Sequence, residues 1–427
     1  MNRPQRIMTR PAWTGRQGTG CMDATTRRGE AHVTISRDAI LHNVKVIRSR
    51  LRPGTRLCAV VKADAYGHDA HIVADTLCNF SYDALEGPAV DALAVATLEE
   101  ADALGPTPVP VHVLRPVEAG SIRDQRQMLL SAVRTGRVLT VVSAPAAADL
   151  GRLAAALGRP AAVQIMIDTG HAREGAAPHD VPAVLAAVAA QPALRLAAVC
   201  THLVSSEQPD DPFTAHQLAM FRRIIDNLAP AAPLVRHVAN SGGVFLHPES
   251  HFDMVRPGIS IYGIDPTGRP TAARPLRPAM KWTAPLLMTR RVSRGQSVGY
   301  NRTWVAPRDT TLGLVGVGYA DGYMRCFSNR AVMIVRGRTA PVVGRVNMDY
   351  TTIDLHDVPD AVPGDQVTVM DSDPLSPASV YALAQLADTI PYEILCRIGP
   401  RMSRVVLESQ PAAADEPEAP AQRRQAV

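Results

Sequence analysis

The 427-residue sequence predicts an α/β fold in which a (β/α)8 TIM-like barrel is followed by a β-rich C-terminal domain. Short apolar segments alternate with amphipathic helical segments over about 230 residues. The apolar segments are almost continuous, which is typical of parallel strands that helices cover on both faces. After residue 265 the pattern changes to short β-type segments separated by Gly and Pro. We therefore place the barrel at residues 31–265 and the β-rich domain at residues 266–408.

The barrel elements follow one another as strand and helix. Residues 32–51 predict a short strand and then a helix, because apolar residues from Ile40 to Leu51 recur near helical spacing. Further strands are predicted at residues 57–61, 92–96, 110–114, 139–143, 162–168, 195–202, 234–240 and 254–263. Helices are predicted at residues 69–78, 98–104, 145–158, 181–191 and 213–229. About eight units fit a (β/α)8 barrel, but a doubly wound open sheet has the same periodicity and stays the alternative.

The second domain begins after a linker. Residues 266–279 are rich in Pro, Thr and Gly, as linkers are. The β-type segments that follow span residues 286–300, 311–320, 330–346, 350–355 and 365–371. Residues 1–30 predict a disordered extension, or an early start with Met22 as the true one. Residues 409–427, composed largely of Ala, Pro, Glu and Arg, predict a disordered tail.

Composition excludes several classes of protein. The net charge of +5 is carried mainly by residues 1–30, at +4, so the part between the two tails is nearly neutral. A nucleic-acid surface usually needs a focused basic patch, and the central sequence has none. The sequence has no 18-residue charge-free apolar run and no signal-peptide pattern. Its six cysteines are scattered without metal-knuckle spacing, which suits a reducing cytoplasm and predicts no metal site.

Lys62 directly follows the apolar segment at residues 57–61. A lysine at a strand end is most often a solvated surface residue. In a βα barrel, however, catalytic groups stand at the carboxyl ends of strands. Apolar neighbours lower the pKa of a lysine there, and the free amine can form a Schiff base with an aldehyde. Pyridoxal phosphate (PLP) is the cofactor that uses such a lysine. It would also need a phosphate seat, a group facing its pyridine nitrogen and a second acid–base group.

Six segments together resemble the alanine racemase family, in that family's order. They are "AVVKADAYGH" (59–68), "HVANSGG" (237–243), "DMVRPGISIYG" (253–263), "VGYADGY" (317–323), "GRVNMDY" (344–350) and "TIPYEILCRIGPRMSRV" (389–405). The resemblance covers residues 31–407, nearly the whole predicted folded chain. It implies a PLP-dependent racemase of fold type III.

The resemblance implies a role for each of two catalytic residues. Lys62 would hold PLP covalently and exchange the Cα proton on one face of the substrate, and Tyr319 would act on the opposite face. Racemisation needs one group on each face. A free tyrosine has a pKa of about 10, so a nearby cation must favour its phenolate. We expect an arginine there, with Arg404 as the candidate.

The resemblance also implies the residues that bind cofactor and substrate. Arg256 would face the pyridine nitrogen and, because arginine stays protonated, would leave that nitrogen unprotonated. Met348 would offer its backbone N–H to the substrate carboxylate, and Asp349 would support that loop. Arg173 would contact the phenolic oxygen of PLP and the substrate. The remaining cofactor-binding residues are predicted to be Tyr66, His202, Asn240, Ser241, Gly258, Ile259 and Tyr392. Taken singly, Arg256 would equally suit a surface ion pair and Met348 would equally suit a core position. A lone histidine such as His202 is more often structural.

The sequence departs from the common family pattern at a few positions. Position 166 is Met, where many relatives carry a lysine that can be carbamylated to orient the arginine at position 173. An anion such as chloride could substitute, or Arg173 could be held differently. Asn347 stands where many members have cysteine, and residues 79–91 are an insertion. None of these changes removes a catalytic group.

Alanine racemisation, supplying D-alanine for the cell wall, is the function that the resemblance implies, in a homodimer with shared active sites. A racemase of serine, lysine or several amino acids is the first alternative. A fold-related decarboxylase is the second, although such enzymes typically face the pyridine nitrogen with a carboxylate. A non-enzymatic PLP carrier would leave the β-rich domain unexplained.

Overall fold

A closed barrel of eight parallel strands forms the first lobe of the computed structural model, which describes residues 6–10, 21–23, 30–80, 87–228 and 234–407. The strand order is β10-β11-β4-β5-β6-β7-β8-β9, so the barrel prediction is confirmed over the open sheet. The strands are β4 (Arg56–Val60), β5 (Ala92–Val95), β6 (Val111–Pro116), β7 (Val138–Val141), β8 (Ala161–Met166), β9 (Leu194–Cys200), β10 (Val235–His237) and β11 (Met254–Val255).

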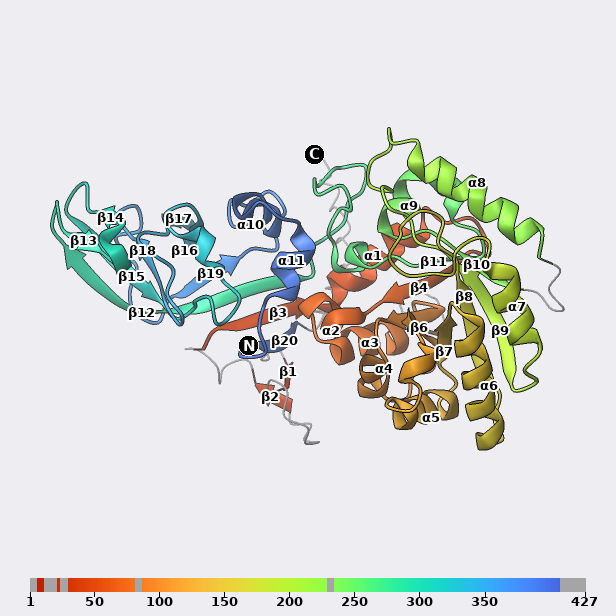
Figure 1. The fold of residues 1–427 in the computed structure, drawn as a ribbon. Helices are drawn as coiled ribbons and strands as arrows, with labels where there is room; N and C mark the ends of the chain where they lie inside the picture. The colour runs from red at the N-terminus through yellow and green to blue at the C-terminus, as the bar shows by residue number, and fades with distance from the viewer. Residues whose placement is uncertain (1–5, 11–20, 24–29, 81–86, 229–233, 408–427) are drawn as a thin grey trace, which may run out of the picture.

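Helices surround this barrel (Figure 1). They are α1 (Arg37–Arg48), α2 (Lys62–Gly67), α3 (Ala70–Asn79), α4 (Leu98–Leu104), α5 (Arg126–Arg134), α6 (Ala144–Leu157), α7 (Val181–Ala189), α8 (Phe213–Asp226) and α9 (Ser241–Leu246), with short 3-10 turns η2 (Ala119–Ser121), η3 (Pro248–Ser250) and η4 (Ile259–Tyr262). Capping side chains begin two of these helices, α4 and α6. Thr97 and Glu100 form a capping box at α4, and Ser143 caps α6 through the N–H of Ala146.

A second, elongated lobe extends to one side of the barrel (Figure 1). Its strands are β12 (Met280–Val292), β13 (Ser297–Val298), β14 (Trp304–Val305), β15 (Thr310–Val315), β16 (Val332–Val335), β17 (Arg338–Pro341), β18 (Thr351–Asp354), β19 (Gln366–Met370) and β20 (Ser403–Leu407). Its helical segments are η5 (Tyr300–Arg302), η6 (Arg325–Phe327), α10 (Val380–Ala387) and α11 (Pro391–Cys396). The long strand β12 pairs with β3, β15 and β19, and so organises the lobe. The predicted β-rich domain is confirmed.

The N-terminal residues depart from the predicted domain division. Strand β3 (His32–Ser36) does not enter the barrel but pairs with β12 and β20 in the second sheet. Strands β1 (Arg6–Arg10) and β2 (Cys21–Asp23) also form, with β1 antiparallel to β20, so a wholly disordered 1–30 is wrong for these residues. The physical reason is that β20 offers a free edge that another strand can satisfy. Residues 1–5, 11–20, 24–29 and the predicted tail 409–427 lie outside the described residues.

The insertion at 79–91 is described in part, because residues 81–86 lie outside the described residues. On its N-terminal side the guanidinium of Arg37 lies over the ring of Phe80, 4.2 Å from its centroid. On its C-terminal side Ala89 and Val90 are buried, and the N–H of Ala89 donates to the carbonyl of Leu77. The ends of the insertion are therefore packed onto the barrel at α1 and α3.

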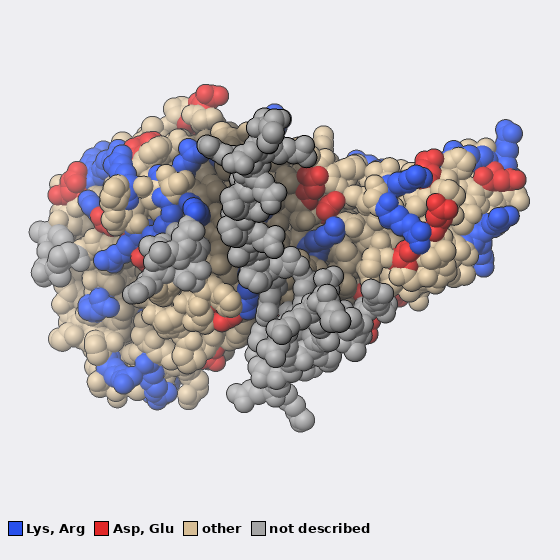
Figure 2. Space-filling view, turned by 180° about the vertical axis from the view of Figure 1, so that it is seen from behind, with Lys and Arg blue, Asp and Glu red and all other residues tan. Residues whose placement is uncertain are grey.

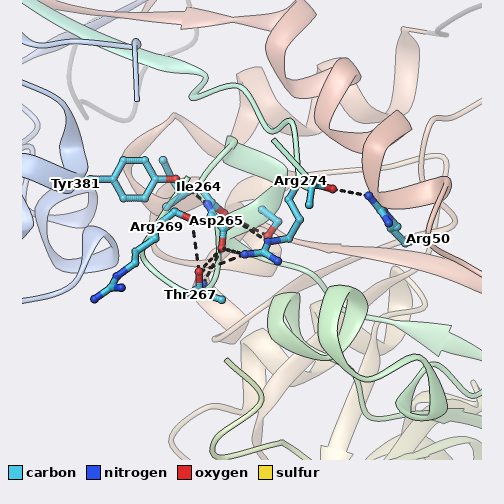
Figure 3. Close-up of polar contacts among 9 residues, drawn as sticks. Arg50, Ile264, Asp265, Thr267, Arg269, Arg274 and Tyr381 are labelled. Atoms are coloured by element: carbon cyan, nitrogen blue, oxygen red, sulfur yellow. Dashed lines mark hydrogen bonds and ion pairs between the residues drawn. The ribbon is translucent and has the colours of Figure 1, made fainter. Parts of the chain in front are cut away.

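The linker between the lobes is held by one buried carboxylate (Figure 3). Asp265 is 2% exposed and accepts hydrogen bonds from the Nε of Arg274 at 2.6 Å and the hydroxyl of Thr267 at 2.7 Å. Its own N–H donates to the hydroxyl of Tyr381 on α10 at 2.8 Å. Farther along, Arg50 from the end of α1 donates to the carbonyl of Ala273. The linker thus contacts both lobes and fixes their relative placement.

The molecular surface mixes charges. On the face seen in Figure 2, acidic side chains lie among basic ones on both lobes, so this face lacks the uniform basic surface of a nucleic-acid site. Within the described residues, no helix has the length and apolar character needed to cross a membrane. In the same residues, no group of three or more His, Cys, Asp or Glu side chains could hold a metal ion.

Candidate active site

Lys62 stands at the carboxyl end of barrel strand β4, one residue after the N-cap position of α2. Its side chain is half-buried and makes no hydrogen bond or ion pair with the part of the chain that the structure describes. Desolvation lowers the pKa of Lys62, and the positive charge of Arg173 lowers it further, while Glu174 and Glu100 oppose the shift. A larger fraction of this amine is therefore uncharged and nucleophilic than in a solvated lysine.

The backbone after Lys62 turns in a left-handed helix. The four residues from Ala63 to Tyr66 have φ between 52° and 55°. Each costs about 1–2 kcal/mol for an L-residue, so the surrounding structure must enforce the turn. Glu100 accepts the N–H of Ala63, and Asp64 accepts the N–H of Ala70, each at 2.8 Å. The turn directs Lys62 and Tyr66 while their backbone stays pinned to α3 and α4.

An aromatic cluster supports this turn. The ring of Tyr66 lies 4.9 Å from that of Tyr262 and 5.9 Å from that of Tyr392 on α11. The Tyr262 hydroxyl donates to the carbonyl of Val60 at 2.8 Å. Burial lowers the pKa of His68 to about 4, and its neutral ring donates from Nδ1 toward the carbonyls of Ala65 and Tyr66. The predicted wall of Tyr66 and Tyr392 therefore forms within one chain.

Two loops of the barrel meet at Ser241 and Gly258. The hydroxyl of Ser241 accepts the N–H groups of Gly258 at 3.1 Å and Ser260 at 3.3 Å. Asn240 caps α9 through the N–H of Gly243, and its side-chain oxygen accepts the hydroxyl of Ser206 at 2.6 Å. These contacts bring the predicted phosphate-seat residues together at the start of two short helical segments, α9 and η4.

Gly258 is required at this point by close packing. A Cβ atom at Gly258 would lie 2.3 Å from the hydroxyl oxygen of Tyr66, far inside van der Waals contact. The hydroxyl of Tyr66 is therefore packed against the backbone of Gly258. The hydroxyl groups of Tyr66 and Ser241 and the backbone N–H groups beside them, here called the cradle, are of the kind that an anionic group such as phosphate takes.

Arg256 is buried at 5% exposure beneath this cradle, and its guanidinium is fixed by four contacts. NH1 donates to Nδ1 of His237 at 2.6 Å and to the His237 carbonyl, while NH2 donates to the carbonyls of Thr201 and Val238. Because Nδ1 of His237 accepts, its proton resides on Nε2, which is buried without a partner. Burial lowers the pKa of Arg256, but an arginine remains a cation near neutral pH.

His202 follows strand β9 and faces a cationic environment. Burial, and then the charges of Arg256, Arg173 and Lys62, lower its pKa well below the ordinary value. Its ring is therefore neutral at physiological pH, and it lies 5.7 Å from the ring of His171. A neutral imidazole in this position suits stacking beside a flat ring better than proton donation.

Arg173 lies on the loop after strand β8, with its side chain 53% exposed. Its guanidinium donates to both carboxylate oxygens of the neighbouring Glu174, with NH2 to Oε1 at 2.6 Å. The hydrogen bond to Glu174 raises the pKa of Arg173. Met166, at the end of β8, is a buried apolar side chain and offers no anionic partner.

Tyr319, Met348 and Asp349 lie together on two adjoining loops of the second lobe. The N–H of Tyr319 donates to the carbonyl of Asn347, and the N–H of Ala320 donates to that of Met348, each at 3.0 Å. The Tyr319 side chain is 43% exposed and that of Met348 is 54% exposed. Within the described residues, no hydrogen bond or ion pair joins Tyr319 to Lys62.

Arg401 ties these two loops to each other. It lies 3.0 Å from Oδ1 of the buried Asp321 and donates to Oδ1 of Asp349 at 2.9 Å. Asp321 also accepts the N–H of Gly318 at 2.9 Å, which closes the turn that carries Tyr319. The loop with the predicted acid–base group and the loop with the predicted carboxylate-binding N–H thus move as one unit.

These two lobes have known counterparts. The family model described as alanine racemase, N-terminal domain, matches residues 35–266, and that described as alanine racemase, C-terminal domain, matches residues 279–406. The chain belongs to the alanine racemase family. The Rhodospirillum rubrum alanine racemase is 38% identical over 382 residues, which cover 88% of this chain and 96% of that protein.

Solved structures of the family have the same fold. The alanine racemase from D-cycloserine producing Streptomyces lavendulae superposes with a TM-score of 0.78 at 32% identity, covering 90% of this chain and 98% of that one. The alanine racemase from Bartonella henselae, solved with covalently bound pyridoxal phosphate, superposes with a TM-score of 0.76 at 29% identity, covering 88% and 99%. The family predicted from the sequence is therefore confirmed.

The residues of this family member fit pyridoxal phosphate. The amine of Lys62, which has no hydrogen-bond or ion-pair partner among the described residues, suits the aldehyde, and the cradle at Gly258 suits the phosphate. The buried cation of Arg256 suits the pyridine nitrogen. An amine, an anion cradle and a fixed cation along one side of the barrel match the three ends of this cofactor.

Arg404 does not fill the role predicted for it. Its Nε donates to the carbonyl of Gly67, NH1 to those of Gly399 and Met402, and NH2 to that of Ile398. The guanidinium therefore links β20 to α2 and α11, and makes no contact with Tyr319 among the described residues. Buried carbonyl groups at the end of α11 need donors, and Arg404 supplies them.

Sequence reasoning also missed Glu100, Tyr262, Arg401 and Glu174. The motifs "ISIYG" and "RIGPRM" contain Tyr262 and Arg401 but do not state their contacts. The segment "HAREG" places Glu174 directly after the predicted Arg173, which is the signal that could have pointed to it. Glu174, on the loop after β8, and Glu100, in α4, both oppose the lowered pKa of Lys62, and both come near Lys62 only in the folded barrel.

Proposed function

We propose that this protein interconverts L-alanine and D-alanine with pyridoxal phosphate, and so supplies D-alanine for peptidoglycan. The observation that carries the proposal is Lys62, a half-buried amine without an ion pair among the described residues, placed beside the cradle of Tyr66 and Gly258. Membership of the alanine racemase family supports the isomerase class, the cofactor and the substrate. The acidic and basic groups around Lys62 support a lysine that is free to react.

Each end of the cofactor has residues proposed to hold it. Lys62 would attach it covalently, and the phosphate would lie against Ser241, Gly258 and Ile259, with Asn240 holding that loop in place. The hydroxyl groups of Tyr66 and Tyr392 would close the phosphate end. His202 and Arg173 would flank the ring, with Arg173 toward the phenolic oxygen.

Arg256 sets how strongly the cofactor acts. When bound, pyridoxal phosphate supplies an electron sink that weakens the Cα–H bond of an attached amino acid. Arg256 keeps its protons, since its guanidinium already donates to His237, Thr201 and Val238. Facing the pyridine nitrogen of a bound cofactor, it would offer no proton to that nitrogen and would limit side reactions. This fixed cation also argues against a decarboxylase, in which a carboxylate typically faces that nitrogen.

Two groups move the proton. Lys62 would take or give the Cα proton on one face, and the phenolic oxygen of Tyr319 would do so on the other. The substrate carboxylate would lie against the N–H of Met348 and the guanidinium of Arg173. Asp349 and Arg401 hold the Met348 loop against the Tyr319 turn, so binding and proton transfer share one scaffold.

A homodimer would bring the two groups together. Tyr319 and Met348 are exposed on the elongated lobe, and no contact links Tyr319 to Lys62 among the described residues. A two-fold pair could set this face of one chain against the Lys62 side of another. The cytoplasm is the proposed compartment, since the five described cysteines are free thiols.

The direct test uses the purified protein with L-alanine in deuterated water, beside a panel of other L-amino acids, followed by chiral analysis. We expect Cα-deuterated D-alanine to form faster than any other D-isomer. Faster formation of another D-isomer would move the substrate and keep the mechanism. Release of CO₂ without a D-isomer would overturn the proposed function.

A further inference from the structure

Glu174 holds Arg173 in an arrangement that fixes the guanidinium plane. Both carboxylate oxygens accept hydrogen bonds, one from Nε and one from NH2 at 2.6 Å. A two-point contact between a planar guanidinium and a planar carboxylate constrains orientation as well as distance. The Glu174 side chain is 26% exposed against 53% for Arg173, so the carboxylate lies on the inner side of the pair.

The loop that carries this pair is rigid. The side-chain oxygens of Asp168 accept the N–H groups of Gly170, His171 and Ala172 at 2.8 to 3.2 Å. A Cβ at Gly175 would lie 2.7 Å from the backbone nitrogen of Asp168, so the loop closes tightly on itself. Arg173 and Glu174 are thus presented from a fixed backbone above strand β8.

The pair lies within electrostatic reach of Lys62. The charge of Arg173 lowers the pKa of Lys62, and that of Glu174 raises it. Cys200 at the end of β9 also responds to Glu174, which raises the pKa of its thiol. The two opposite charges act on the pKa of Lys62 in opposite directions. Free movement of Arg173 would change both the charge and the contacts around the amine.

Arg173 has no other carboxylate partner among the described residues. The nearest candidate position on the strand itself, Met166, is buried and apolar. A bound chloride would have to displace or share a guanidinium edge that Glu174 already occupies. The carboxylate therefore makes a second anion unnecessary.

We propose that Glu174 is the positioning residue that supplies the anionic partner of Arg173 and holds it toward cofactor and substrate. This inference rests on the proposed function, since it concerns the same site. It implies that the enzyme works without a modified lysine at position 166 and without a bound halide. Racemisation by the unaltered protein should therefore be insensitive to added chloride.

The test compares Glu174→Ala, Glu174→Gln and Glu174→Asp with the control Glu118→Ala, which removes an exposed carboxylate at the start of η2, on a separate loop after strand β6. Racemisation rates and the rate of PLP release from the holoenzyme are measured for each. We expect Glu174→Ala to lower kcat by about tenfold to a hundredfold and to release PLP faster, because a misplaced guanidinium loses its contacts.

Further variants and an added anion distinguish a role of the Glu174 charge from a role of its side-chain shape. Formate should restore kcat of Glu174→Ala in a saturable way, and should leave the unaltered enzyme and Glu118→Ala unchanged. Glu174→Asp should keep more activity than Glu174→Gln. Full activity of Glu174→Gln, or failure of formate to improve Glu174→Ala, would overturn the inference.

Two further outcomes are distinguishable. If Glu174→Ala does not fold, as judged by its melting temperature, Glu174→Gln tests the inference instead. Unchanged PLP release and an unchanged racemisation rate in Glu174→Gln overturn the inference. Faster PLP release with slower racemisation supports it. If the unaltered protein racemises no amino acid, the proposed function fails. The PLP-release comparison then still decides whether Glu174 holds Arg173.

Discussion

The Lys62 side and the Tyr319 side of the proposed reaction differ in how far one chain completes them. Lys62 is half-buried, its left-handed turn is pinned by Glu100 and Asp64, and α11 of the same chain adds Tyr392 to its wall. Tyr319 is 43% exposed on a turn that is internally rigid but faces no described partner. One chain therefore encloses Lys62 and leaves Tyr319, the proposed second proton-transfer group, at a surface.

This contrast explains why both lobes are needed. The barrel supplies burial, which lowers the pKa of Lys62 and keeps His202 neutral. The elongated lobe supplies a tyrosine and an N–H on loops fixed by backbone hydrogen bonds and by Arg401. The barrel residues depend on burial for their protonation states, and the residues of the elongated lobe depend on the loops that hold them in place.

The largest effect should come from removing the barrel amine. Lys62→Ala should lower the racemisation rate by about a thousandfold or more, because it removes both the attachment point and one proton-transfer group. Mass spectrometry after borohydride reduction should show no attached PLP. Lys281→Ala, which removes the lysine paired with Asp371 in the other lobe, serves as the control and should keep full activity.

Tyr319→Phe should lower the racemisation rate nearly as much as Lys62→Ala, but without loss of PLP attachment. We expect a loss of about 10²- to 10⁴-fold in kcat with PLP still attached, since only the hydroxyl is removed. Tyr350→Phe, on the adjoining loop and equally exposed at 43%, is the matched control. Unchanged racemisation by Tyr319→Phe would contradict the assignment of Tyr319 as the second base.

Mixing the two inactive variants tests whether Lys62 of one chain and Tyr319 of another chain form one active site. Lys62→Ala and Tyr319→Phe, unfolded together and refolded, should regain about a quarter of the unaltered activity, because half of random dimers would hold one intact site out of two. The readout is D-alanine formation by the mixture against each variant refolded alone. No recovery in a mixture that forms mixed dimers would place both groups of a site in one chain.

Arg401→Gln should have a smaller effect, confined to the Tyr319 side. The buried carboxylate of Asp321 loses its counter-charge and the two loops lose their shared tie, so kcat/KM should fall by about tenfold with PLP attachment unchanged. Arg397→Gln, which breaks only an exposed contact to Glu393, should behave as the unaltered enzyme. Equal losses in both variants would argue against a positioning role.

A separate effect, on stability and not on rate, should be a pH dependence that belongs to the barrel. Burial lowers the pKa of His68 and of His112 to about 4 in the folded state, against about 6.5 when unfolded. The unfolded chain therefore binds more protons between these values, so stability is present above pH 6.5 and is lost as the pH falls toward 4. The expected slope is about 1.4 kcal/mol per pH unit for each histidine. Urea unfolding from pH 7 to pH 5 measures it, and His112→Gln should flatten the slope.

Much of the fold and of the Lys62 site could be predicted from local sequence. A run of apolar residues ending in Lys62 predicts a barrel strand with a functional group at its carboxyl end, and β4 has that form. Arg256 likewise follows the short strand β11, and Ser241 opens α9 after the capping residue Asn240. Such features depend on periodicity and capping, which act over a few residues.

Long-range pairing could not be predicted in the same way. The segment at β3 has the pattern of a barrel strand, yet it pairs with β12 and β20 in the other lobe. An apolar strand pattern states that a segment is buried but not which strand it meets. Arg404 was misassigned for a related reason, since its partners are carbonyl groups that come together only after α11 docks against α2.

The sequence by itself determined the chemistry of this protein: its family, its lysine at a strand end, and the residue types for an anion cradle and a fixed cation. Only the tertiary structure decided how those groups are held. No local propensity favours four left-handed residues in "ADAY", and the turn exists because contacts from α3 and α4 offset its cost. The hydrogen-bonded contact between Arg173 and Glu174 also depends on the tertiary structure, because the loop closed by Asp168 and Gly175 sets the two side chains face to face.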